Sequence, residues 1–315
     1  MAAFIHFVTR TCIIGGSGFI GRRLLRLLLE HERTVVVVGR RRESPFDPSV
    51  EYHSVAVDDA RGLAAVLKSA DEVIDVAYST FPQTSFQDPV KDILENLTQS
   101  VRNFEALVDT AVRRVVYVSS GGTVYGQATQ VPIREDHPTN PVSPYGITKL
   151  AIEKYGLMFH ATKGLPLIVV RPSNAYGEGQ VPFRGQGFVA TAIAASLRSE
   201  SIKIFGPEGA TRDYIHVDDV AGGIVAALLH ADIGDVYNVG TGIGSTNVDI
   251  VNELRPMLAA LGHEMDVEVL PARAFDVKVN VLDANKLFAA SGWRPTVTLN
   301  AGLRRTVEWL SAQTG

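Results

Sequence analysis

A tyrosine and a lysine four residues apart, Tyr145 and Lys149, are the side chains in this sequence best suited to acid–base chemistry. Ser143 and Pro144 precede them as an N-cap and a first-turn residue, which predicts a helix that places both side chains on one face. A free phenol has a pKa of about 10, and a neighbouring ammonium stabilises the phenolate. We therefore expect Tyr145 to accept and return a proton, with Lys149 supplying positive charge.

A polar glycine loop, Ser119–Gly126, supplies hydroxyl groups that can accompany this pair. It follows the apolar run Val115–Ser119, which predicts a buried strand, and ligands of open α/β sheets bind at the carboxyl ends of strands. The hydroxyls of Ser119, Ser120 and Thr123 are candidates to hold the substrate oxygen that gains or loses the proton. The alternative is that these hydroxyls only close the loop.

A second glycine-rich segment, residues 15–21, has glycines at every third position between a predicted strand and a predicted helix. Glycines let the backbone approach a pyrophosphate, whose charge is stabilised by the free N–H groups and the dipole of the helix N-terminus. No Gly-Lys-Ser/Thr sequence ends the segment, which argues against an ATP-binding loop. The residues expected to bind a nicotinamide dinucleotide here are Gly15, Gly18, Phe19, Ile20 and Gly21.

The end of the second predicted strand bears on the choice between NAD and NADP. An acid at this place accepts hydrogen bonds from the adenine ribose of NAD, but Gly39 is followed by Arg40, Arg41 and Arg42. Guanidinium groups suit a 2′-phosphate, so the sequence leans toward NADP, while a solvated basic turn is the alternative. Further along, the pair Asp58 and Asp59 is predicted either to meet the adenine edge or to cap a helix.

Short apolar runs alternate with amphipathic stretches, which predicts an α/β fold: a doubly wound parallel Rossmann sheet with a smaller C-terminal α/β substrate lobe. The predicted strands are Thr11–Ile14, Val35–Val38, Glu72–Ala77, Val115–Ser119 and Leu167–Arg171. The predicted helices are Phe19–Glu30, Arg61–Lys68, about 90–110, about 144–162, Asp218–His230 and Asp249–Leu261. We expect residues 1–171 to bind the dinucleotide and residues 172–315 to bind mainly the substrate. A strand at Asp235–Val239 is expected to return to the first sheet, so that about 213–240 also belongs to the first domain.

Composition excludes several classes of function. The net charge of −4 argues against nucleic acid and anionic membranes as partners. No apolar run approaches the roughly 20 residues that span a bilayer, and Met1–Val8 lacks a basic leader, so we expect a cytoplasmic protein. The single cysteine, Cys12, is expected to be a buried strand residue. We expect no metal, because His216 with Asp218 and Asp219 suits strand packing and helix capping better than ligation.

These motifs together resemble the extended short-chain dehydrogenases/reductases of the NAD-dependent epimerase/dehydratase family. The likeness runs along essentially the whole chain. Besides the two glycine loops and the Tyr-x-x-x-Lys pair, the segments that carry it are Cys12–Gly15, Arg171–Gly177, Arg212–Asp219 and Gly292–Pro295.

The resemblance implies roles for residues that spacing alone does not single out. Asn174 and Arg212 would contact the diphosphate side of the substrate, and Phe205 would contact the nucleotide base. Arg273 with Asp276 would contact the diphosphate and ribose. We also expect Ala77 at the cofactor and Ser79 at the substrate. Arginines suit a diphosphate through forked, charge-assisted hydrogen bonds, whereas the alternative is that each is a surface charge.

One departure from the family pattern matters for catalysis. Many relatives carry a third hydroxyl residue where this sequence has Gly121, which makes Thr123 the main candidate for that role. Dehydratases of the class carry an acid after the catalytic threonine, and Val124–Tyr125 cannot replace it, so dehydration is disfavoured.

The resulting expectation is a nucleotide-sugar 4-epimerase, which transiently oxidises carbon 4 of the sugar and reduces it again. The alternative is an NADPH-dependent nucleotide 4-keto-sugar reductase. A nucleotide-binding scaffold without catalytic activity is disfavoured, because it would leave Tyr145 and Lys149 unexplained. The substrate is expected to be a nucleotide-diphosphate sugar, and the sequence does not identify its base or its sugar. Helices near 90–110 and 144–162 are expected to form a homodimer.

Overall fold

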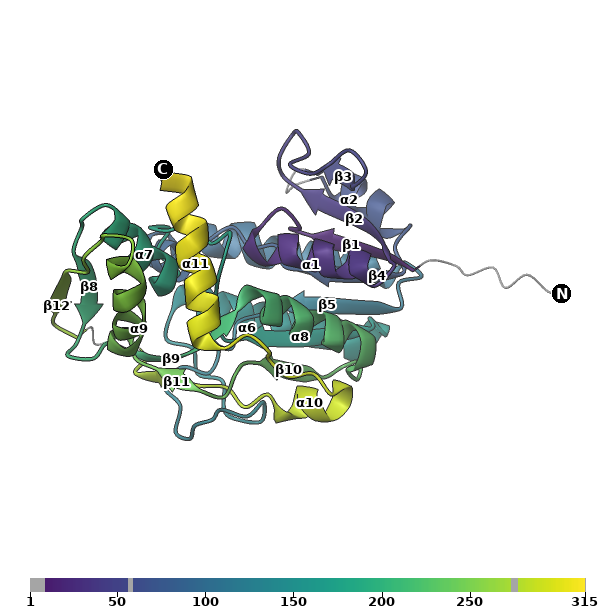
Figure 1. Cartoon of the computed structure of the whole chain (residues 1–315). Coiled ribbons are helices and arrows are strands. Elements are labelled where there is room, and N and C mark those ends of the chain that lie inside the picture. The colour runs from purple at the N-terminus through teal and green to yellow at the C-terminus, as the bar shows by residue number, and fades with distance from the viewer. Residues whose placement is uncertain (1–8, 56–58, 273–276, 315) are drawn as a thin grey trace.

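A seven-stranded parallel sheet forms the centre of the molecule, with strand order β10-β6-β5-β4-β1-β2-β3 (Figure 1). The computed structural model describes residues 9–55, 59–272 and 277–314. The strands of the sheet are β1 (Arg10–Ile14), β2 (Thr34–Gly39), β3 (Glu51–Ser54), β4 (Glu72–Asp75), β5 (Arg114–Val118), β6 (Leu167–Pro172) and β10 (Val236–Val239). The sheet confirms the predicted α/β doubly wound fold, and β10 pairs with β6 as expected.

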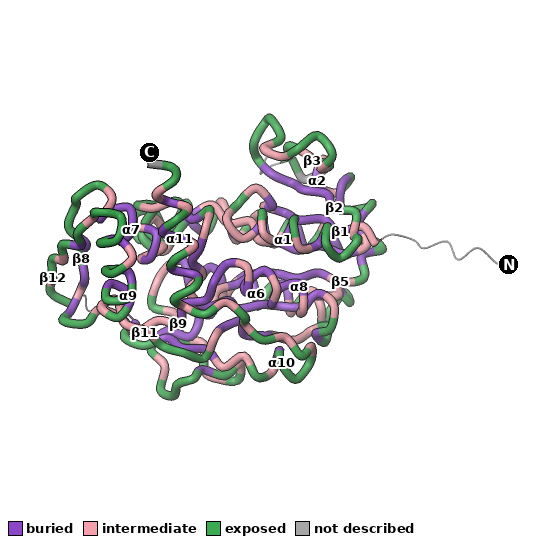
Figure 2. Tube along the Cα trace, in the orientation of Figure 1, coloured by how far each residue is buried: buried purple, intermediate pink, exposed green. Residues whose placement is uncertain are grey.

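Helices cover both faces of the sheet, because its strands are apolar on both sides. Alternate residues of a strand point to opposite faces, so Ile13 packs under α1 (Phe19–Glu30) and α8 (Val217–His230), whereas Cys12 belongs to the core on the other face. The helices on that second face are α2 (Ala60–Leu67), α5 (Thr98–Val108) and α6 (Pro144–Lys163). Figure 2 shows the buried strands between helices whose outer surfaces are exposed.

The smaller lobe lies at one end of the sheet, beyond the carboxyl ends of its strands (Figure 1). Its core is formed mainly by three helices and the strands beside them. The helices are α7 (Phe188–Leu197), α9 (Asn247–Ala259) and α11 (Leu299–Thr314). The strands are β7 (Asn174–Tyr176), β8 (Ile202–Phe205), β9 (Thr211–His216), β11 (Gly244–Ser245), β12 (Val267–Leu270) and β13 (Val279–Asn280). The short helix α10 (Asn285–Ser291) packs against α8 and β10 instead.

The helix expected near residues 90–110 is present from residue 89 to 108, and a π-helical turn lies within it. The chain forms α3 (Pro82–Gln87), α4 (Pro89–Asp92), a π-helical segment η1 (Ile93–Leu97) and then α5. The wider turn of a π-helix shifts the side chains around it, and such segments are frequent at functional sites. It changes which residues of this stretch face the interior.

Helix α6 begins as predicted. The Ser143 side chain accepts a hydrogen bond from Gly146 N at 3.1 Å, Pro144 occupies the first turn, and Gly164 ends the helix with a φ of 72°. Because this N-cap fixes the start of the helix, it also fixes the direction in which Tyr145 and Lys149 point.

Candidate active site

Three adjoining pockets run from the carboxyl ends of the strands into the lobe. The β2 pocket lies among the ends of β1, β2 and β4, and the central pocket lies among the glycine loop, the ends of β5 and β6 and the start of α6. The lobe pocket lies among α7, β8 and β9. Gly15, Gly18 and Tyr78 line both the β2 and central pockets, while Gln186 lines both the central and lobe pockets. The three pockets therefore form one continuous cleft.

The glycine loop has the geometry expected for a dinucleotide. Gly15 has a φ of +87°, and a Cβ there would lie 2.8 Å from Ala77 Cα, while a Cβ at Gly21 would lie 2.5 Å from Gly16 Cα. Larger side chains at 15 and 21 would thus force the strand, loop and helix apart. Gly18 is the N-cap of α1 and, with Phe19, Ile20 and Gly21, lines the central pocket beside the helix N-terminus.

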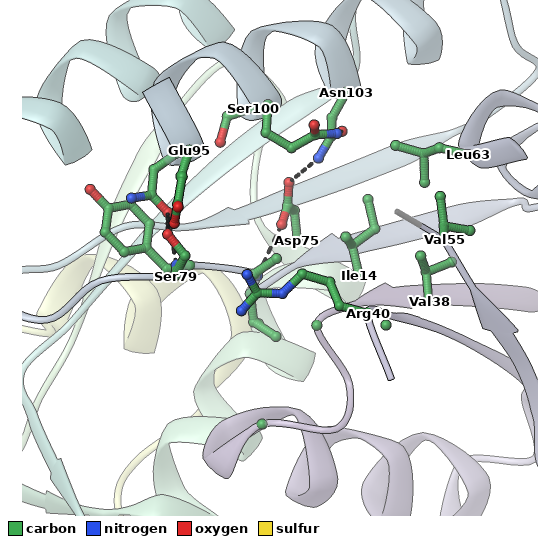
Figure 3. A pocket seen from close by; sticks show the side chains of 18 of the residues that line it. Ile14, Val38, Arg40, Val55, Leu63, Asp75, Ser79, Glu95, Ser100 and Asn103 are labelled. Atoms are coloured by element: carbon green, nitrogen blue, oxygen red, sulfur yellow. Dashed lines mark hydrogen bonds between the residues drawn. The ribbon is translucent and has the colours of Figure 1, made fainter. Parts of the chain in front are cut away.

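The basic residues after β2 divide between the pockets. Arg40 lines the β2 pocket, and Arg41 lines the central pocket. Figure 3 shows the Arg40 side chain reaching across the β2 pocket toward Asp75 and Ser79. Asp59 takes the second of its two predicted roles, because its carboxylate accepts from Gly62 N at 2.8 Å and caps α2. Asp58 lies outside the described residues.

The end of β4 contributes buried polar groups to the β2 pocket. Asp75 accepts hydrogen bonds from Asn103 Nδ2 at 3.0 Å and from Ala77 N at 3.1 Å, and burial raises the pKa of its carboxyl (Figure 3). Ser79 donates its N–H to Asn96 Oδ1 at 2.8 Å. Ala77 and Ser79 both line the β2 pocket, so Ser79, which was expected at the substrate, lies on the side of the glycine loop and not in the lobe pocket.

Tyr145 and Lys149 lie together in the central pocket. The Tyr145 N–H donates to Ser85 Oγ at 3.1 Å, and Lys149 Nζ donates to the Val118 carbonyl at 2.8 Å. Burial lowers the pKa of Lys149 to about 8, although the Asp75 carboxylate opposes the shift. Burial and then Asp92 raise the pKa of Tyr145, whereas a hydrogen bond with the Ser120 side chain lowers it. Without further positive charge, therefore, Tyr145 stays protonated.

The three candidate hydroxyls occupy different environments. Ser119 and Ser120 line the central pocket, and Ser120 is hydrogen-bonded to Tyr145. Thr123 does not line that pocket, and its buried Oγ1 has no hydrogen-bond partner among the described residues. The geometry places Ser120 beside the phenol, and Thr123 stays a prediction.

The loop also explains the glycine that departs from the family pattern. A Cβ at Gly121 would lie 2.4 Å from Leu282 Cδ1 and 3.0 Å from the Arg171 carbonyl oxygen. A hydroxyl residue at this position would therefore need the neighbouring segments to move. In this chain the loop must supply its hydroxyls from adjacent positions.

Residues expected at the substrate gather in the lobe pocket. Asn174, Phe205 and Arg212 line it together with Lys203 and Glu200. Its walls thus combine an aromatic ring, an amide and two cations, which is a chemistry suited to a base and a diphosphate. Arg273 and Asp276 lie outside the described residues.

Two residues that sequence reasoning missed border the pair on α6. Tyr78 lines the central pocket, and its ring contacts the Tyr145 ring edge-on with centroids 4.8 Å apart. Asp92 is 0% exposed and accepts from the Tyr78 hydroxyl at 3.3 Å. No local pattern singles out either residue, because Tyr78 follows β4 and Asp92 ends α4, and the two meet only in the folded chain.

Comparison with known proteins agrees with this geometry. A model of the NAD dependent epimerase/dehydratase family matches residues 11–240. The chain belongs to this family. The relationship confirms the resemblance seen in the sequence and identifies the chain as an enzyme of the extended short-chain dehydrogenase/reductase type.

Individual relatives cover the chain almost completely. The UDP-glucose 4-epimerase of Mycolicibacterium smegmatis is 35% identical over 311 residues, which is 95% of this chain and 98% of that protein. The UDP-glucose 4-epimerase of Thermotoga maritima, solved with UDP-glucose, has a TM-score of 0.90 at 29% identity and covers 98% of this chain and 100% of its own. That of Thermus thermophilus, solved with NAD, has a TM-score of 0.87 at 30% identity, covering 96% and 99%.

The described residues also bear on metal binding and membrane insertion. They contain no group of three or more His, Cys, Asp or Glu side chains placed to hold a metal ion. Among the same residues, no helix combines the length and the apolar character that crossing a membrane requires.

Proposed function

We propose that this chain is a 4-epimerase of UDP-sugars. The observation that carries the proposal is the position of Tyr145 and Lys149 in the central pocket, between the glycine loop and the pocket of the lobe. A sugar carbon held there would face a dinucleotide bound at the glycine loop, while the nucleotide attached to the same sugar would lie in the lobe pocket. The relatives from M. smegmatis and T. maritima, both UDP-glucose 4-epimerases, support UDP as the nucleotide.

In the proposed reaction, Tyr145 accepts the proton of the sugar 4-hydroxyl and later returns it, and Ser120 holds the same oxygen by a hydrogen bond. Lys149 stabilises the phenolate. An oxidised nicotinamide, if held by the glycine loop, would supply further positive charge and the capacity to accept a hydride from carbon 4 and to return it. The lobe holds the nucleotide while the oxidised sugar turns over. A 4-keto-sugar reductase is the less favoured alternative, and the feature of this chain that supports it is the run of basic residues after β2.

For the substrate, we propose that Arg212 and Asn174 bind the diphosphate and that Phe205 contacts the base, as the family pattern implies. Arg273 and Asp276 remain proposed partners of the diphosphate and ribose. The corresponding proposal for the domains is that residues 1–171, with about 213–240, bind the dinucleotide, and that residues 172–315 mainly bind the substrate.

For the cofactor, we propose that the β2 pocket accepts NADP as well as NAD. Arg40 lines this pocket, and Gly39 leaves no carboxylate that would repel a 2′-phosphate. The exposed guanidinium of Arg40 is free to turn toward the adenine ribose.

We propose that the chain forms a homodimer through α4, η1 and α6. These elements pack against one another and carry large apolar side chains on their outer surface. Val90 is 63% exposed, Leu94 60% and Ile147 56%. Burying this patch in a second copy would remove it from water. Light scattering should report a dimer, and Leu94→Asp with Ile147→Asp should give a monomer.

The activity test uses purified protein and UDP-galactose without added cofactor. Conversion to UDP-glucose without a net change in nicotinamide absorbance supports the proposal. If the protein instead consumes added NADPH stoichiometrically with a 4-keto sugar, the epimerase proposal is wrong and the chain is a reductase. Tyr145→Phe should lower kcat at least ~100-fold with cofactor still bound. The control is Tyr155→Phe, which changes an exposed tyrosine of the same helix and should leave the rate unaltered. Full activity of Tyr145→Phe would refute the proposed base.

A further inference from the structure

Tyr78 is the aromatic ring closest to the ammonium of Lys149. Lys149 Nζ lies 4.1 Å from the centroid of the Tyr78 ring, but 5.0 Å from that of Tyr117 and 6.0 Å from that of Tyr145. The Tyr78 ring also meets the Tyr145 ring edge-on at 4.8 Å. It therefore touches both members of the proposed acid–base pair.

A buried carboxylate fixes this ring in place. Asp92 is 0% exposed and accepts hydrogen bonds from the Tyr78 hydroxyl at 3.3 Å, from Asn96 Nδ2 at 3.3 Å and from the hydroxyl of Thr80. Asn96 is itself tied to the β4 loop through Ser79 N at 2.8 Å. Asp92 ends α4 and Asn96 lies in η1, so the junction of these two segments holds the carboxylate that accepts the hydrogen bond of the Tyr78 phenol.

Of the three phenols near the Lys149 ammonium, Tyr78 and Tyr145 line the central pocket whereas Tyr117 does not, and the surroundings of these two differ. Tyr78 donates to a carboxylate, which disfavours its ionisation, whereas Tyr145 is hydrogen-bonded to Ser120 and lines the central pocket. The ammonium is held on two sides, by the Val118 carbonyl and by the face of the Tyr78 ring.

We infer that Tyr78, anchored by Asp92, is a positioning residue that holds the Lys149 ammonium next to Tyr145, so that the proton moves through Tyr145 alone. This inference rests on the proposed role of Tyr145 as the base. It assigns to Tyr78 no contact with the reacting carbon and no proton transfer of its own.

The charges around the pair determine the sign of the pH effect. Lys149 faces the carboxylates of Asp75, Glu153 and Asp92, all of which oppose the lowering of its pKa by burial. Among the carboxylates, Asp92 acts on Tyr145, whose pKa it raises together with burial. Removing the charge of Asp92 should therefore favour the Tyr145 phenolate and move the acidic limb of the kcat profile to lower pH.

The test compares three variants of the full-length enzyme with a matched control. Tyr78→Leu removes the ring and should lower kcat at least ~10-fold, with KM for UDP-galactose changed less than ~3-fold. Tyr78→Phe keeps the ring but loses the hydrogen bond to Asp92, so its kcat should lie between those of Tyr78→Leu and the wild type, while Asp92→Asn should shift the acidic limb as above. The control is Tyr237→Leu. The Tyr237 ring also contacts a lysine ammonium, with Lys286 Nζ 4.8 Å from the ring centroid, but Tyr237 lines none of the three pockets.

The outcomes separate the inference from the function on which it rests. Active Tyr145→Phe would refute the base itself. If Tyr145→Phe is inactive but Tyr78→Leu keeps full kcat, the positioning role is wrong. It is equally wrong if Tyr78→Leu changes only KM, or if Tyr237→Leu loses as much kcat as Tyr78→Leu. Should Tyr78→Leu fail to fold, Tyr78→Phe and Asp92→Asn decide: an unmoved pH profile in Asp92→Asn overturns the inference.

Discussion

Replacing Arg40 tests whether the β2 pocket distinguishes NADP from NAD. The guanidinium lines that pocket, so Arg40→Ser removes the group proposed to face a 2′-phosphate and leaves the glycine loop unchanged. A hydrogen bond to a charged group contributes about 1.5–3 kcal/mol. Because the side chain is exposed, solvent screening places its contribution at the lower end. The expected result is an NADP affinity roughly tenfold lower, with NAD affinity changed less than about threefold.

The assay is a calorimetric titration of cofactor-stripped protein with each dinucleotide. Arg42→Ser is the matched control, since Arg42 belongs to the same basic run but lines neither the β2 pocket nor the central pocket. An equal loss of NAD and NADP affinity in Arg40→Ser would refute the reasoning. So would an Arg42→Ser variant that loses NADP affinity to the same extent.

Three further predictions follow from buried groups. Glu153→Gln leaves the Arg171 guanidinium, bound to Glu153 Oε2 at 2.6 Å, without its counter-charge and should lower the free energy of unfolding by about 3 kcal/mol in urea titrations; a loss under about 1 kcal/mol contradicts this. Cys12 is 0% exposed with its pKa raised to about 12 by burial, so a thiol reagent at mildly alkaline pH should label it only after denaturation. Burial lowers the pKa of Lys149 from 10.5 to about 8. The loss of folding free energy that comes from burying its positive charge is therefore absent above pH 10.5 and reaches its full value below about pH 8. Thermal melts of cofactor-free Lys149→Met should therefore show stability relative to wild type rising as the pH falls through this window, and a pH-independent difference would count against it.

The core of the fold was predictable because its signals are local. Strand–loop–helix patterns such as Thr11–Glu30 combine β-branched runs, glycines and an amphipathic helix within a few dozen residues. Helix α7 (Phe188–Leu197) was missed because apolar residues occupy nearly all its positions and leave no helical period to read. Strand β3 (Glu51–Ser54) is short and polar, and it is a strand only because it pairs with β2.

The site residues likewise divide into those with a local sequence signal and those without one. Tyr145, Lys149 and the glycine loop are marked by short-range spacing, and the structure brings them together in the central pocket. Tyr78 and Asp92 were not connected with the pair, because their contact joins the loop after β4 to the end of α4 and is formed only by folding. Likewise, only the packing of Leu282 shows why position 121 must be glycine.

The position of β10 at the edge of the sheet has a consequence for how the protein is made. The strand that pairs with β6, and the helix α8 that packs against α1, are both synthesised after β6 and after the first part of the lobe, which ends with β9. During translation strands β1 to β6 emerge with one face of their sheet uncovered beside α1, until residues 217–239 have left the ribosome. Such a surface is a natural binding place for chaperones, and a chain terminated before β10 should be recovered as aggregates and not as a soluble half-protein.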